Sequence, residues 1–175
     1  MFKTIAGRLM PAMLAIVATA FAGVRIASAG EGVAYELEFR SRASEYFGHS
    51  YVVARKIGRS GKALSERLAG FDPVPGTPLV ATLRGVRGVV DATPADRSTP
   101  PDERFKVRVS RAQYGRAMAK IEANARRHPT FNLTEQNCNT FVGRVARAAG
   151  LNAPERSAEL PREYVRQMRE VNSAR

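Results

Sequence analysis

Apolar and polar residues alternate in two segments of the 175-residue chain, at 33–39 and 105–109, and the segment 48–54 is rich in β-branched and aromatic residues. Alternation with a period of two is typical of a strand with one buried face. Shorter runs at 79–83 and 88–91 are rich in apolar and β-branched residues, and we expect two further strands there. The pattern therefore predicts a small sheet whose strands are spread through much of the chain.

Helical spacing replaces this alternation in the second half of the chain. The segment 110–127 places apolar residues on one helical face, and Ser110 with Gln113 has the spacing of a capping box. Asn137 is suited to cap a second helix. A third helix is predicted at 158–171, on the surface of the domain.

The segments between these elements carry turn and loop signals. We expect a short helix at 62–68, a turn at 70–76 and an exposed, proline-containing loop at 93–102. No internal repeat or long linker divides the chain. The predicted fold is therefore a single α+β domain over residues 30–175, with a small, mainly antiparallel sheet packed by helices.

Residues 1–29 have the composition of a secretory signal peptide. Lys3 and Arg8 precede a short apolar stretch, and the small residues at 27–29 form the pattern that signal peptidase reads. We therefore expect cleavage before Gly30 and a periplasmic or secreted location. An ordinary amphipathic N-terminal helix is the alternative.

The chain is strongly basic, with 28 Lys and Arg residues against 16 Asp and Glu and a formal net charge of +12. The basic residues are scattered, without the compact block interleaved with aromatic residues that a nucleic-acid surface requires. We expect a solvated basic surface that contacts anionic polymers of the cell envelope. No specific nucleic-acid partner is expected, and the protein is expected to be a monomer.

Cys138 is the only cysteine, so it forms no internal disulfide. It follows Asn137 directly, in the first turn of the predicted helix. Unpaired backbone N–H groups and the helix dipole favour a thiolate at this position, and the same N–H groups can hold an oxyanion. The alternative is that Cys138 packs in the core, as lone cysteines on apolar helix faces commonly do.

The chain contains two histidines, His49 and His128. His49 lies on a predicted strand, a rigid element that can present an imidazole to a helix end, although a structural histidine is the simpler alternative. His128 follows two arginines at the end of a predicted helix and is interpreted as a solvated cation. One cysteine and two histidines are too few for a zinc site, so we expect no metal and no cofactor.

The sequence FNLTEQNCNTF at 131–141, with the GRVA and GLNAP segments that follow it, resembles the cysteine motif of circularly permuted papain-fold thiol hydrolases. These include the PPPDE desumoylating isopeptidases and, more distantly, relatives of lecithin:retinol acyltransferase and permuted members of the NlpC superfamily. In them the histidine strand precedes the cysteine helix, and GHSYVV at 48–53 is similar to that strand. The resemblance implies a permuted papain-like, NlpC-type fold, with Cys138 as the nucleophile and His49 as the base.

In many of these relatives a third polar residue orients the imidazole. Asp91, at the end of the predicted strand 88–91, is the candidate here, although an acidic residue at this place is commonly turn chemistry. A Cys–His dyad without a third member is also compatible with the resemblance.

The resemblance implies an exported cysteine hydrolase, an amidase, peptidase or acyl-transfer enzyme, whose substrate is an acyl or peptide compound such as cell-wall peptide or a lipid. The alternative is a non-catalytic basic binding module of the cell envelope, which predicts an unreactive Cys138. Extracellular nucleic-acid binding is a third possibility. It predicts a steep loss of affinity with salt and no effect of Cys138→Ala.

Overall fold

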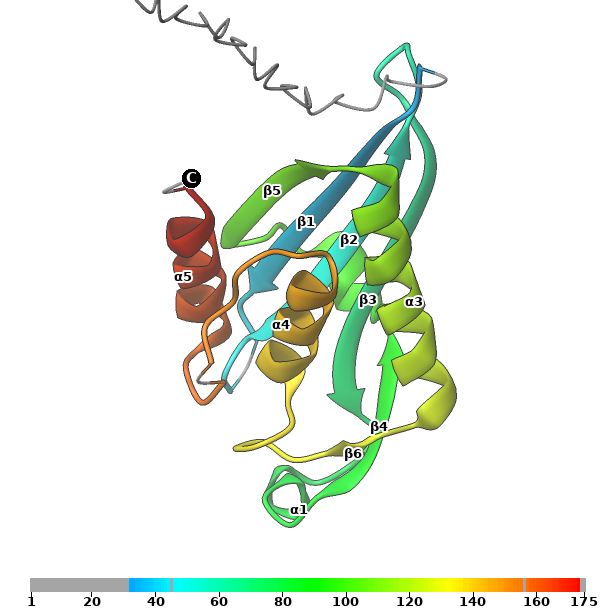
Figure 1. Ribbon diagram of the computed structural model, residues 1–175. Helices are drawn as coiled ribbons and strands as arrows, with labels where there is room; N and C mark the ends of the chain where they lie inside the picture. The colour runs from blue at the N-terminus through cyan, green and yellow to red at the C-terminus, as the bar shows by residue number, and fades with distance from the viewer. Residues whose placement is uncertain (1–31, 45, 156, 174–175) are drawn as a thin grey trace, which may run out of the picture.

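The computed structural model describes residues 32–44, 46–155 and 157–173, which form one open six-stranded sheet and its covering helices (Figure 1). The strand order is β5-β1-β2-β3-β4-β6, and neighbouring strands are antiparallel. The fold is therefore α+β with an antiparallel sheet, as the hydrophobic pattern predicts. In chain order the elements are β1 (Ala34–Arg42), β2 (His49–Ile57), β3 (Ala63–Pro73), α1 (Leu79–Thr82), β4 (Val86–Asp91), α2 (Pro94–Ser98), β5 (Glu103–Val109), α3 (Arg111–Arg127), β6 (Thr130–Phe131), α4 (Cys138–Ala148) and α5 (Pro161–Ser173).

The alternating residues of β1 separate the two faces of the sheet. Leu37 and Phe39 are fully buried in the hydrophobic core beneath the long helices. Glu36 and Glu38 lie on the opposite face, where Arg55 of β2 forms ion pairs with both carboxylates. The polar positions of the predicted strand therefore belong to a charged network on the second face.

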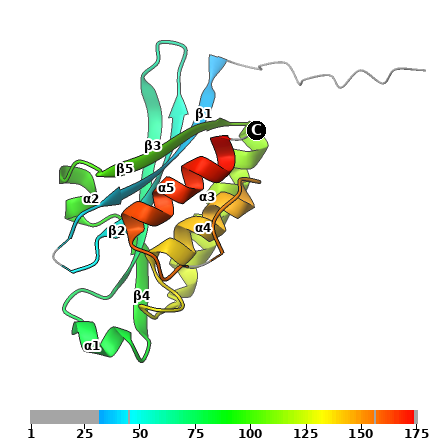
Figure 2. The ribbon, with the colours of Figure 1, turned by 90° about the vertical axis from the view of Figure 1, so that its left-hand side faces the viewer.

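The helices α3, α4 and α5 cover the apolar face (Figures 1 and 2). Ser110 and Gln113 form the predicted capping box of α3, and Asn137 caps α4. The last helix, α5, lies at the periphery, where it packs against β1 and β5 and buries Tyr164 and Met168. It is thus amphipathic, with one face in the core.

Two short segments differ from the predictions. The segment 62–68 is predicted to be helical, but it belongs to β3, because it pairs with β2 in a hairpin that places Glu66 opposite Arg55. The segment 79–83 is predicted to be a strand, but it contains the one-turn helix α1, which follows Pro78 and lies in the connection between β3 and β4 (Figure 1). For segments this short, tertiary pairing outweighs local preference.

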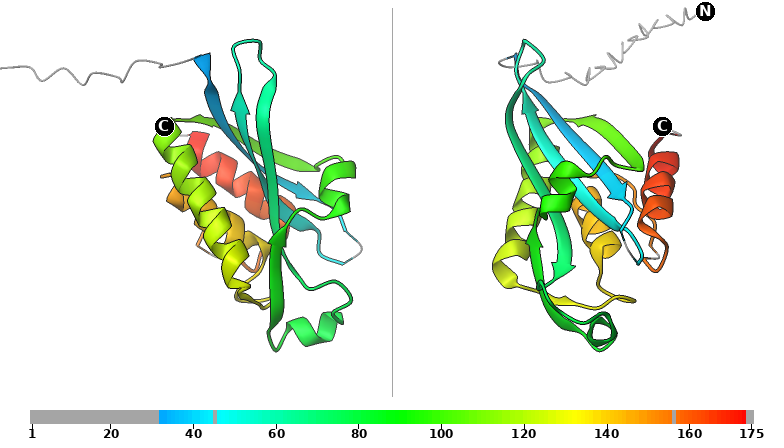
Figure 3. Two further views of the ribbon diagram at one scale, coloured as in Figure 1. Left: turned by 90° about the vertical axis from the view of Figure 1, so that its right-hand side faces the viewer. Right: turned by 180° about the vertical axis from the view of Figure 1, so that it is seen from behind.

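The turn and the loop between these elements are also shorter than predicted. Within 70–76, β3 continues through four residues that pair with β4, and the turn begins at Val74. The segment 93–102 contains helix α2, which starts with a capping box between Thr93 and Asp96 and buries the Asp96 side chain. Figure 3 shows α2 on the face of the sheet opposite α3, α4 and α5.

The predicted signal peptide, residues 1–29, lies outside the described residues. Among the helices of the described ranges, none combines the length and the apolar character needed to cross a membrane.

Candidate active site

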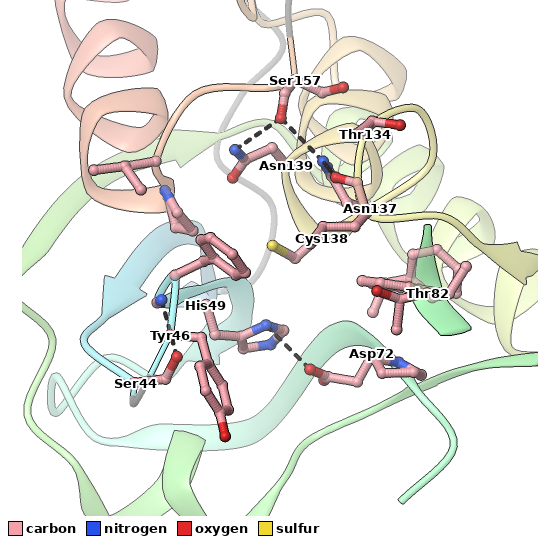
Figure 4. Close-up of a pocket in the computed structure, with 18 of the residues that line it drawn as sticks. Ser44, Tyr46, His49, Asp72, Thr82, Thr134, Asn137, Cys138, Asn139 and Ser157 are labelled. Carbon is pink, nitrogen blue, oxygen red and sulfur yellow. Dashed lines mark hydrogen bonds and ion pairs between the residues drawn. The ribbon is translucent and has the colours of Figure 1, made fainter. Parts of the chain in front are cut away.

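A pocket of about 410 Å³ opens where the start of β2, the end of β3 and the start of α4 meet (Figure 4). The segments 46–48 and 157–161, together with α1 and β6, contribute to its walls. Cys138 and His49 both line this pocket. The structure therefore brings the expected nucleophile and the expected base into one cavity.

Cys138 is the first residue of α4, and Asn137 builds the start of this helix. The Asn137 side chain accepts a hydrogen bond from the N–H of Thr140 at 3.1 Å, and its carbonyl oxygen accepts one from Phe141 at 3.1 Å. The N–H groups of Cys138 and Asn139 have no acceptor within the helix. Together with the helix dipole, they favour negative charge at the sulfur and at an oxyanion beside it.

The pKa of the Cys138 thiol lies below its usual value. Burial alone would raise this pKa, but the imidazole of His49 and the hydroxyl and backbone N–H groups of Ser50 outweigh burial. Ser50 follows His49 in β2, so one strand start supplies both stabilising groups. In Figure 4 the thiol and the imidazole extend toward one another across the pocket.

His49 is the first residue of β2, and only 4% of it is exposed. Burial disfavours the charged ring, but the carboxylates of Asp72 and Asp96 and the thiolate of Cys138 outweigh burial and raise the pKa of His49 to about 9. The two shifts act in the same direction, since each favours the thiolate–imidazolium form of the pair over the neutral form.

Asp72 lies beside His49 because β2 and β3 are the two strands of a hairpin. Tyr51 of β2 pairs with Gly70 of β3 in the antiparallel register. Two residues toward the start of β2 and the end of β3, the same register places His49 opposite Asp72. The His49 Nδ1 atom lies 3.3 Å from Oδ1 of Asp72. Asp72 is half-buried, and burial raises its pKa even though the neighbouring His49 lowers it. Its carboxylate is therefore placed to orient the ring and to stabilise its proton.

A second carboxylate, from Asp96, lies on the other side of the ring. The His49 Nε2 atom is buried, has no hydrogen-bond partner among the described residues, and lies 3.8 Å from Oδ2 of Asp96. Asp96 itself accepts hydrogen bonds from Arg42 Nε at 2.7 Å and from the N–H of Thr93 at 2.8 Å. Negative charge therefore flanks both nitrogens of the imidazole.

His49, Asp72 and Asp96 place ligand atoms within 4.8 Å of one another, a spacing that suits a metal ion. Both oxygens of Asp96 already accept hydrogen bonds, one of them from the guanidinium group of Arg42. A bound cation would meet this positive charge at close range. The three side chains therefore fit an ion-paired imidazole better than a metal centre.

Asn139 connects the start of α4 to the start of β2. Its Oδ1 atom accepts a hydrogen bond from the Ser50 hydroxyl at 2.8 Å, and its Nδ2 atom donates to the carbonyl oxygens of Ser157 and Glu159. These bonds set the helix that carries Cys138 against the strand that carries His49. In the sequence, Asn139 is visible only as a polar residue beside the cysteine. That position is the one sequence signal for its role in joining α4 to β2.

Asp91, the expected third residue, lies away from this cluster. It is exposed at the end of β4, where it accepts hydrogen bonds from Arg67 at 2.8 Å and from the N–H of Ala92, and Arg67 lowers its pKa. The structure places Asp72 beside His49 instead. His128 ends α3 in a left-handed backbone conformation and is absent from the described residues that line the pocket.

The pocket thus combines an ionisable thiol, an imidazole that can carry its proton, and backbone N–H groups that can bind an oxyanion. This set of groups can transfer an acyl group through a covalent intermediate. Compared with protein-family models, with curated proteins and with solved structures, the chain matches none of them. The functional assignment therefore rests on the geometry and chemistry of the pocket itself.

Proposed function

We propose that this protein is a cysteine hydrolase of permuted papain-like, NlpC-type architecture, with Cys138 as the nucleophile and His49 as the general base and acid. The observation that carries the proposal is the meeting, in one pocket, of a thiol at the first residue of a helix with a buried imidazole whose Nδ1 lies 3.3 Å from a carboxylate. The direction of the pKa shift of each group supports it. A cysteine that only packs in a core does not require such a partner.

In the first half of the reaction the Cys138 thiolate attacks the carbonyl carbon of an ester or amide, and a carbon–sulfur bond forms. The carbonyl oxygen becomes an oxyanion, which the N–H groups at the start of α4 stabilise. His49 then donates its proton to the leaving oxygen or nitrogen as the scissile bond breaks. The products of this step are the acyl-enzyme, a neutral imidazole and the free alcohol or amine.

In the second half, neutral His49 takes a proton from water, and the resulting hydroxide attacks the acyl carbon. The carbon–sulfur bond breaks, the carboxylic acid leaves, and the thiolate–imidazolium pair is restored. If another alcohol or amine replaces water, the same steps transfer the acyl group. Asp72 holds the imidazole during both halves through its contact with Nδ1.

We further propose that the protein acts in the cell envelope, on an acyl or peptide substrate such as cell-wall peptide or lipid. The leader-like residues 1–29 support this location, as does the net charge of +9 on residues 30–175, where 25 Lys and Arg stand against 16 Asp and Glu, since a basic surface favours contact with anionic polymers. N-terminal sequencing of the protein from its own cell should begin within a few residues of Gly30. An intact Met1 terminus in the soluble cytoplasmic fraction would contradict export.

Alkylation of the thiol by iodoacetamide as a function of pH tests the catalytic proposal. Because Cys138 is the only cysteine, whole-protein alkylation reports on this residue alone. We expect a midpoint below the pKa of a free cysteine, about 8.5, in the wild type and in a His128→Ala control. His49→Ala should shift the midpoint upward, because it removes the cation that stabilises the thiolate.

The midpoint is the decisive quantity in this experiment, since a closed pocket slows any reagent without changing the pKa of the thiol. A common midpoint near 8.5 for the wild type and His49→Ala would overturn the proposal. Cys138 would then be a packing residue, and a binding module would be the better interpretation.

A further inference from the structure

Apolar side chains make up much of the pocket lining, beside polar residues that include Thr82 and Thr134. Phe71 and Phe131 are buried, with their ring centroids 5.3 Å apart in a tilted arrangement, and Leu133 lies on the same wall. The reacting carbonyl would lie between Cys138 and His49, which line the same pocket. Hydrocarbon surface is therefore available in the pocket that contains the nucleophile.

Apolar side chains also surround the mouth of the pocket, where they are open to solvent. Four of the nine large hydrophobic residues that are exposed in the described ranges line this pocket, and they come from three separate segments. Their exposed fractions are 66% for Tyr46, 47% for Phe47, 41% for Leu79 and 61% for Leu160. Apolar groups concentrated in this way around one cavity typically mark a site for an apolar ligand.

The charged groups in the pocket are unsuited to an anionic peptide. Asp72 and Glu159 carry carboxylates into the lining, and none of the described lining residues is a lysine or an arginine. A peptide with free carboxylates would be repelled here, whereas a hydrocarbon chain carries no charge.

We infer that the substrate of the proposed reaction carries an apolar acyl chain of medium length. This inference rests on the proposed function, because the acyl carbon must lie at the Cys138 sulfur. The chain would then lie against the apolar lining, which includes Phe71, Phe131 and Leu133 and the exposed Phe47 and Leu160. A pocket of about 410 Å³ lies within the range of small-molecule sites.

Hydrolysis of p-nitrophenyl esters from acetate to decanoate tests the inference, with Cys138→Ala to subtract background hydrolysis. We expect kcat/KM to rise by up to about fourfold for each added methylene, until the chain fills the pocket. The double variant Phe47→Ser and Leu160→Ser should lower the octanoate-to-acetate ratio of kcat/KM several-fold. Both residues are exposed, so the variant should fold.

Leu64→Ser is the matched control, because Leu64 is 64% exposed near the tip of the β2–β3 hairpin and does not line the pocket. It should leave the octanoate-to-acetate ratio unchanged. Leu133→Trp gives an independent test, since a larger side chain on the pocket wall should shorten the ester that gives the highest kcat/KM.

The acyl chain could be carried by a lipid or by an acylated peptide, and two further substrates distinguish these sources. One is dioctanoyl phosphatidylcholine, which has no net charge, below its micelle concentration, and the other is a peptide with an octanoyl-lysine. Turnover of the first alone assigns a lipid ester, and turnover of the second alone assigns an acylated peptide. Turnover of both supports the acyl chain as the shared recognition element.

The failure of this inference is distinguishable from the failure of the proposed function. A kcat/KM that stays flat or falls with chain length, while Cys138-dependent hydrolysis of the acetate ester persists, would overturn the acyl-chain inference alone. Loss of all Cys138-dependent hydrolysis, with an ordinary alkylation midpoint, would overturn both.

Discussion

At the scale of single residues, the position of the His49 ring depends on a missing side chain. A Cβ atom at Gly70 would collide with Nε2 of the imidazole. Gly70 is not among the glycines with a positive φ, so the backbone of β3 does not itself require glycine there. Glycine is therefore required at position 70 to leave space for the imidazole of His49.

Gly70→Ala should displace the imidazole while leaving β3 intact, because alanine fits an extended strand. We expect the alkylation midpoint of Cys138 to rise by roughly one pH unit and ester hydrolysis to fall roughly 100-fold. Gly115→Ala is the control, since a Cβ there meets nothing within 4 Å on an exposed face of α3. It should leave the midpoint unchanged and stabilise the protein by about 0.5–1 kcal/mol. An unaltered midpoint in Gly70→Ala would show that His49 does not act on the thiol.

At the scale of secondary-structure elements, the site depends on how α4 is fixed to β2. The first turn of α4 touches the strand through Asn139 and Ser50, and the same asparagine holds the segment 157–159. A shift of the helix would move Cys138 and its N–H groups away from His49 together. Asn139 is therefore a positioning residue for the thiol.

Asn139→Ala removes these bonds and leaves buried polar groups without partners. We expect a loss of about 1–3 kcal/mol in the free energy of unfolding, together with a raised alkylation midpoint. Urea unfolding and the pH dependence of alkylation measure the two effects separately. Asn124→Ala is the control, because the Asn124 side chain bonds only the Lys120 carbonyl within α3. A change in stability without a change in midpoint would make Asn139 purely structural.

The elements that could be predicted from the sequence are those with several repeats of a period. The strand around Phe39 and the helix from Ser110 have this property, and both are found in the structure. The segments 62–68 and 79–83 are too short to show a period, so pairing with β2 and the position of Pro78 decide their structures. The hydrophobic pattern of the sequence therefore predicts the long strands and helices but not the structure of the short segments between them.

The same limit applies to the site. Cys138 and His49 stand out because thiol and imidazole chemistry is scarce in this chain and helix capping is visible in the sequence. Asp72 and Asp91 both lie where a strand gives way to a turn, and only the register of the β2–β3 hairpin reveals which carboxylate meets the imidazole. Register depends on pairing between strands, which a single segment does not encode.

At the scale of the whole molecule, the sheet separates an apolar interior from a charged face. Glu38 is 1% exposed on the charged face, between Arg40 and Arg55. Burial would raise the pKa of Glu38, but the hydrogen bonds from the two arginines outweigh it and lower the pKa from 4.5 to about 2. The folded protein therefore stabilises the ionised carboxylate of Glu38 more than the unfolded chain does.

This difference predicts a loss of stability in acid. The contribution of Glu38 is present above pH 4.5 and is lost as the pH falls through about 2, with a total of about 3 kcal/mol. Urea unfolding at several pH values measures it, and Glu38→Gln should weaken the pH dependence in this window. Glu170→Gln is the control, since the Glu170 pair with Arg166 is exposed and contributes little. An unchanged acid profile in Glu38→Gln would assign the acid sensitivity to other carboxylates.

The hydrogen bond between Ser50 and Asn139 has a consequence for folding kinetics, because the two residues are 89 positions apart in the chain. Strands β1, β2 and β3 pair as successive hairpins, which form through short loops, whereas α4 must close a far longer loop to reach β2. Until that closure, Cys138 has no imidazole beside it and reacts as an ordinary thiol. The thiol of a nascent or partly folded chain therefore has an ordinary pKa, and a fall in the alkylation midpoint of Cys138 reports the docking of α4 against β2.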